Sequence, residues 1–141
     1  MTSAITGWGQ ALPDKVLTNA DLEVRLDTSD TWIRERTGIA ERRIGESTIQ
    51  LAIEAGAAAL RTAGLTGDDI DHVVLATSTP DETMPATAVH VHHALGIRGG
   101  AMDLNAACSG FVYGLAVANG LIAAGSRRVL LVGSETMSRI P

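Results

Sequence analysis

The sequence predicts an α/β fold, with a mostly parallel central sheet and helices on both of its faces. Three short apolar segments, at residues 72–77, 101–104 and 129–132, have the composition of buried strands. Segments with helical character lie between them, at 86–95 and 109–124. Strands that alternate with helices in this way are typical of right-handed crossovers and parallel pairing.

The first 64 residues add further elements, each bounded by a capping residue, a proline or a glycine. Ser47 and Gln50 match a capping box, which predicts a helix from there to about Ala63 with Gly64 as its stop. The other expected elements are a strand at 4–10, a helix from Thr18–Asn19 to Leu26, a helix from Thr28 to Gly38, and a strand or extended arm at 39–44.

Composition narrows the class of protein. The chain has 141 residues, 45% of them hydrophobic, which suffices for one domain with its own core, spanning residues 1–141. A net charge of −5 argues against nucleic-acid binding. A single cysteine cannot form an internal disulfide, so a reducing, cytoplasmic location is expected. The N-terminus lacks a signal-peptide pattern, and no apolar segment reaches the ~20 residues of a membrane span.

Cys108 is that single cysteine, and it lies between a predicted strand and an uncharged segment at 109–124 that is expected to be a buried helix. Free N–H groups and the dipole at a helix start lower the pKa of a thiol toward the reactive thiolate. Ligands of α/β sheets bind beyond the carboxyl ends of the strands, where the loop at 77–85 should also lie. This position favours a catalytic cysteine over the alternative, a small, buried and inert one.

Several motifs resemble those of the β-ketoacyl-acyl-carrier-protein synthase III family, in the thiolase-like superfamily. The resemblance extends along the whole chain in order and spacing. The motifs that carry it are Thr18-Asn19-Ala20-Asp21-Leu22-Glu23, Asp27-Thr28-Ser29-Asp30-x-Trp32-Ile33, Arg36-Thr37-Gly38-Ile39, Ala106-Ala107-Cys108-Ser109-Gly110-Phe111 and Leu131-Val132-Gly133-Ser134-Glu135.

The resemblance implies a condensing enzyme of fatty-acid initiation that uses Cys108 as its nucleophile. Cys108 would take an acyl group from acyl-CoA, and the acyl group would then condense with a malonyl acyl-carrier-protein after loss of CO2. No cofactor beyond these substrates is implied, and the family is expected to form homodimers. Trp32 would stack on the adenine of CoA, with Thr28 and Arg36 at the nucleotide end. Met84 would line the acyl pocket of the dimer partner, at a position where phenylalanine is common.

The resemblance also implies that part of the catalytic machinery is absent. The family takes a histidine and an asparagine from a second half, together with a fifth strand in this half, and none of these is found in the chain. We therefore expect an N-terminal thiolase-like half-domain, incomplete at its C-terminus, which alone does not condense acyl and malonyl thioesters. His90, His92 and His93 match no catalytic position and are expected to be a surface cluster rather than a metal site.

Two alternatives remain open from the sequence. One is a relative that uses the same cysteine chemistry to transfer an acyl group to an alcohol or amine, as in secondary metabolism. The other is a non-catalytic dimer partner, against which the presence of Cys108 argues.

Overall fold

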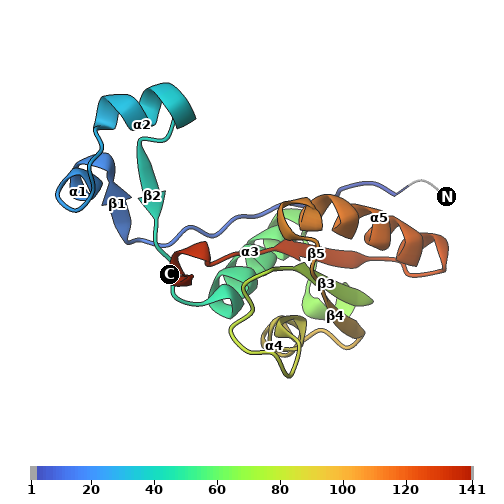
Figure 1. Cartoon of the computed structure of the whole chain (residues 1–141). Helices are drawn as coiled ribbons and strands as arrows, with labels where there is room; N and C mark the ends of the chain where they lie inside the picture. The colour runs from blue at the N-terminus through green and yellow to red at the C-terminus, as the bar shows by residue number, and fades with distance from the viewer. Residues whose placement is uncertain (1–2, 141) are drawn as a thin grey trace.

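The computed structural model describes residues 3–140, and its main body is a three-layer α/β structure (Figure 1). The central sheet has the order β4-β3-β5, formed by Gly100–Leu104, His72–Ala76 and Val129–Gly133. Both pairings are parallel, with His72 opposite Gly100 on one side and opposite Val129 on the other. The predicted parallel sheet is confirmed.

Helices cover both faces of this sheet (Figure 1). On one face, α3 (Thr48–Ala63) and α4 (Thr87–Ala94) pack against each other and against the strands. On the other face, α5 (Gly110–Ala123) crosses β5 and β3. The strand β3 is therefore buried on both sides, which explains its unbroken apolar sequence. The main core comprises Ala52, Leu60, Ile70, Val73, Leu75, Ala88, Val91, Ile97, Leu130 and Val132.

A small lobe stands apart from this body and is joined to it by two chain segments (Figure 1). It contains β1 (Val16–Thr18), α1 (Asn19–Glu23), α2 (Asp30–Thr37) and β2 (Glu41–Arg43), with β1 and β2 antiparallel. The helix α2 ends at Gly38, whose φ of 73° lies in the left-handed region, as the sequence predicts.

Asn19 is the buried centre of the lobe. Its carboxamide donates to Asp30 at 2.7 Å and to the carbonyl of Ile39 at 2.9 Å, and it accepts from Arg42 at 2.5 Å. These bonds join α1, α2 and the strand β2, so a buried, fully bonded polar side chain helps to hold this small unit together.

The predicted strand at 4–10 is wrong. This segment makes no strand pairing and instead runs along α3, where a Cβ placed on Gly9 would lie 2.4 Å from the Ala59 nitrogen. A cavity of about 540 Å³, lined by residues 3–9 and by residues of α3, α5 and β5, lies between the segment and β5. Gly7 and Gly9 therefore allow the segment to pack closely on α3, and the segment does not pair with a strand of the sheet.

Three smaller expectations also need correction. The first helix ends at Glu23 rather than Leu26 and is followed by turns. Ser47 caps α3 by accepting from the N–H of Gln50 at 3.1 Å, but the Gln50 side chain donates to Glu54, so only half of the capping box forms. The strand β1 was not expected at all, because three residues are too few to show an alternating pattern.

The sequence predicts that α5 is a buried helix, and the structure shows that most of it is exposed. Only Gly110 and Gly114 along it are buried, because one narrow face touches the sheet and the remaining faces have no covering element. Across residues 3–140, the structure contains no helix whose length and apolar character would let it cross a membrane.

Candidate active site

The carboxyl ends of the three parallel strands form one rim of the body. The loop at 77–85 follows β3, residues 105–109 follow β4, and residues 134–140 follow β5. Two backbone bonds extend the sheet into this rim: the Thr77 N–H donates to the Leu104 carbonyl, and the Ser134 N–H to the Ala76 carbonyl, both at 3.1 Å. Three loops that are distant in sequence thus begin side by side.

Cys108 lies at this rim, in a 3-10 turn formed by Ala107–Ser109 between β4 and α5. The cysteine is exposed, so the alternative expectation of a buried residue is wrong for this structure. The preceding residue, Ala107, has a φ of 47°, in the left-handed region that residues other than glycine rarely adopt. The thiol therefore sits on a sharp, strained turn from strand to helix, an arrangement that presents a nucleophile to solvent.

A polar network that the sequence did not reveal connects the three rim loops. The Glu135 carboxylate accepts from the N–H of Ser78 at 2.7 Å and from the hydroxyl of Thr79. The hydroxyl of Ser78 donates to the side-chain oxygen of Asn105 at 3.2 Å. The partners are separated by 27 to 57 residues along the chain, so no local sequence motif predicts these bonds.

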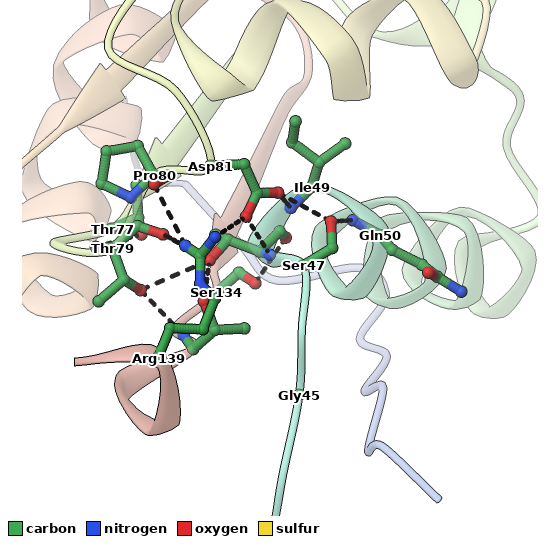
Figure 2. Close-up of polar contacts among 12 residues, drawn as sticks. Gly45, Ser47, Ile49, Gln50, Thr77, Thr79, Pro80, Asp81, Ser134 and Arg139 are labelled. Carbon is green, nitrogen blue, oxygen red and sulfur yellow. Dashed lines mark hydrogen bonds and ion pairs between the residues drawn. The ribbon is translucent and has the colours of Figure 1, made fainter. Parts of the chain in front are cut away.

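Asp81 links the loop at 77–85 to the start of α3 and to the C-terminal segment (Figure 2). Its carboxylate accepts from the Ser47 hydroxyl and the Ile49 N–H, both at 2.8 Å, and from the Thr48 N–H at 3.1 Å. Arg139 pairs with it at 2.6 Å. Burial opposes ionisation of Asp81, but the bonds from Ile49, Ser47 and Thr48 and the charge of Arg139 outweigh it and hold its pKa below the ordinary value.

The lobe carries the residues expected at the nucleotide end of CoA. The side chain of Trp32 is 53% exposed, and the guanidinium of Arg36 lies 5.0 Å from the centre of its ring. The Thr28 hydroxyl is buried and has no hydrogen-bond partner among residues 3–140. Neighbouring arginines have structural partners instead: Arg34 pairs with Asp30 at 2.8 Å, and Arg42 donates to Asn19.

The structure thus brings Trp32 and Arg36 together but does not join them to Cys108. Within the described residues, no hydrogen bond or ion pair links the Cys108 turn to the lobe, which contacts the body mainly through its two connecting segments. The candidate site consists of two separate parts, an exposed cysteine at the rim and an aromatic and basic surface on the lobe.

Comparisons with known proteins identify the chain's relatives. A family model described as 3-oxoacyl-[acyl-carrier-protein (ACP)] synthase III matches residues 102–141. The β-ketoacyl-[acyl-carrier-protein] synthase III of Bradyrhizobium diazoefficiens is 55% identical over 143 residues, which cover 98% of this chain. The resemblance to the N-terminal half of β-ketoacyl-acyl-carrier-protein synthase III is confirmed.

Solved structures of this family agree with the fold. The β-ketoacyl-acyl-carrier-protein synthase III of Thermus thermophilus matches 99% of the chain with a TM-score of 0.94 and 44% identity. The corresponding enzyme of Aquifex aeolicus matches 95% with a TM-score of 0.92 and 46% identity. The α/β, thiolase-like fold class is confirmed. The chain spans only 44% of the length of the Bradyrhizobium and Thermus proteins.

Two further positions that the synthase III resemblance or the sequence singled out lie on the surface. Met84, in the loop at 77–85, is 83% exposed and contributes to no core cluster. His90 on α4 bonds through Nε2 to the Glu82 carboxylate at 2.5 Å. Within residues 3–140, no group of three or more histidine, cysteine, aspartate or glutamate side chains is arranged to hold a metal ion.

Proposed function

We propose that this chain provides the nucleophile-bearing half of a β-ketoacyl-acyl-carrier-protein synthase III. One observation carries the proposal. The only cysteine of the chain is exposed on a strained turn at the carboxyl end of the sheet, in a chain whose relatives bear that name. Residues 1–141 would form the N-terminal, thiolase-like half-domain of such an enzyme.

The proposed chemistry is acyl transfer followed by condensation. The Cys108 thiolate attacks the thioester carbonyl of acyl-CoA, and the CoA thiolate leaves and takes up a proton. A malonyl carrier thioester then loses CO2, and its carbanion attacks the acyl carbon, which releases the Cys108 thiolate and yields a β-ketoacyl thioester. The backbone N–H of Cys108 would stabilise the tetrahedral oxyanion.

The lobe would bind the nucleotide end of CoA. An indole face more than half exposed suits the stacking of a purine, and a guanidinium suits a phosphate or a flat base. Arg36 has no ion-pair partner within residues 3–140, whereas Arg34 and Arg43 do. The unpartnered hydroxyl of Thr28 would gain a partner from the ligand.

Met84 would enter the acyl pocket of a dimer partner, since its own chain leaves the side chain uncovered. Methionine is flexible and fills irregular space, so the pocket would accept primers longer or more branched than acetyl. A homodimer, a cytoplasmic location and the absence of a cofactor other than the substrates belong to the same proposal.

The proposed condensing enzyme and the acyltransferase alternative differ in what accepts the acyl group. A relative 34% identical to this chain is a tetronic acid condensing enzyme, so transfer to another acceptor is the second candidate. Both candidates require an acyl-Cys108 intermediate, whereas a non-catalytic dimer partner requires none.

A labelling experiment tests the proposal. The purified chain is incubated with radiolabelled acetyl-CoA, and trapped label is counted for the wild type and Cys108→Ser. We expect label that disappears in Cys108→Ser, and no β-ketoacyl product when malonyl carrier protein is added. Primer preference is measured on a complete enzyme that contains this half, where we expect unlabelled branched acyl-CoA to displace the label, less so in Met84→Phe. Label independent of Cys108 would refute acyl transfer, and strict acetyl preference unchanged in Met84→Phe would refute the role of Met84.

A further inference from the structure

Hydrogen bonds join the Cys108 turn to the loops on either side of it. The side-chain oxygen of Asn105 accepts from the N–H of Ala107 and from the hydroxyl of Ser78, both at 3.2 Å. The N–H of Ser78 donates in turn to Glu135 at 2.7 Å. A single carboxamide therefore holds the residue before the nucleophile and is itself held by the neighbouring loop.

The loop that holds Asn105 is itself firmly fixed. Thr79 is buried, and its hydroxyl donates to Glu135 and accepts from the N–H of Thr136 at 2.8 Å. Arg139 donates to the carbonyl of Thr79 at 2.8 Å while pairing with Asp81, as Figure 2 shows. Ser78 is thus held by hydrogen bonds to both Glu135 and Asn105.

The turn needs such support because Ala107 is left-handed. A side chain at a φ of 47° is sterically disfavoured, and no glycine relieves the strain at this position. Contacts from outside the turn must therefore maintain its shape. The direction of the next residue, Cys108, depends on that shape.

We propose that Asn105 is a positioning residue for Cys108 and that it acts through its bonds to Ala107 and Ser78. Among the described residues, its side chain makes no hydrogen bond to the thiol. It fixes the left-handed turn and so sets the position of Cys108 between β4 and the start of α5. Its importance for acyl transfer rests on the proposed function, but its effect on thiol reactivity does not.

The rate of alkylation by iodoacetamide tests this role, because Cys108 is the only cysteine and all label reports on it. We expect Ser78→Ala to slow alkylation of the folded chain about fivefold, the rate equivalent of one lost hydrogen bond. Asn105→Ala removes two bonds and should slow it at least as much. Ser78→Thr keeps the hydroxyl and should react at close to the wild-type rate. Asn119→Ala is the matched control, since it removes an exposed carboxamide of α5 that bonds only to Ser3 among the described residues.

Two further measurements separate positioning from unfolding. All variants should react equally in urea, and the folded variants should keep the wild-type helicity and melting temperature. The double variant should be no slower than Asn105→Ala alone, because the Ser78 hydroxyl acts on the turn only through its bond to Asn105. Wild-type or faster rates in both single variants would overturn the proposal, and if Asn105→Ala unfolds, Ser78→Ala decides alone. If the Asn105 and Ser78 variants slow alkylation as expected but the wild type takes up no acyl label, the proposed function is rejected and this inference stands.

Discussion

Asp81 shows how one side chain can join three separate segments. It caps the start of α3, belongs to the loop after β3, and pairs with Arg139 after β5 (Figure 2). A carboxylate at a helix start satisfies free N–H groups and complements the helix dipole. The position of the loop beside Cys108 therefore depends on the contacts of Asp81 with α3 and with Arg139.

Replacing Asp81 should destabilise the chain and alter its response to acid. Asp81→Asn weakens the contacts to α3 and removes the ion pair of Arg139, so we expect the unfolding free energy at pH 7 to fall by about 1–3 kcal/mol. The pKa of Asp81 is held below its ordinary value of 3.8, so its contribution is present above that pH and is lost as the pH falls below it. The difference between wild type and variant should therefore shrink below pH 3.8.

Urea unfolding at several pH values measures this difference. Asp68→Asn is the matched control, because Asp68 pairs with Arg98 at an exposed surface where ion pairs contribute little. An equal, small effect of both substitutions at pH 7 would show that Asp81 is not a structural junction.

At the scale of the elements, the sequence predicts what is locally encoded. The strand β3 and its two neighbours are short apolar runs buried by helices, and the ends of α2 and α3 carry their own caps and left-handed glycines. The segment at 4–10 has a similar composition. It could form a strand only beside another strand, but it lies along the helix α3.

The candidate site divides in the same way. Cys108 could be placed from sequence because a strand and a helix flank it, and its exposure follows from that placement. The partners around it could not be placed, since Glu135 meets Ser78 across 57 residues and Arg139 meets Asp81 across 58 through contacts that only the folded chain creates. The candidate residues could be named from local sequence, whereas the contacts that support them could not.

Two glycine substitutions test the packing of the N-terminal segment on α3. A Cβ on Gly9 would meet backbone at 2.4 Å, so Gly9→Ala should force the segment away and cost about 1–3 kcal/mol. Gly120 lies within α5 with no atom within 4 Å of an added Cβ, so Gly120→Ala should stabilise the chain by about 1 kcal/mol. Thermal unfolding compares the two, and a neutral Gly9→Ala would mean that the segment does not pack as described.

For the whole molecule, the uncovered surface of α5 is the most consequential one. Phe111, Val112, Tyr113 and Leu115 are all exposed there, and the segment at 109–124 carries no charged side chain. Exposed apolar surfaces of this extent tend to be covered by another protein surface. The isolated chain, which spans 44% of the length of its Bradyrhizobium relative, leaves this face to water.

We therefore expect the isolated chain to self-associate through α5. Its average mass in sedimentation equilibrium should rise with concentration, and Val112→Lys should reduce that rise, because a charge on the apolar face would have to be desolvated on association. Val24→Lys, on the lobe, is the matched control, since Val24 is at least as exposed but lies outside the α5 face. Both substitutions are at the surface, so the melting temperature of the monomer should change little. Equal masses for wild type and Val112→Lys at every concentration would mean that this face does not drive association.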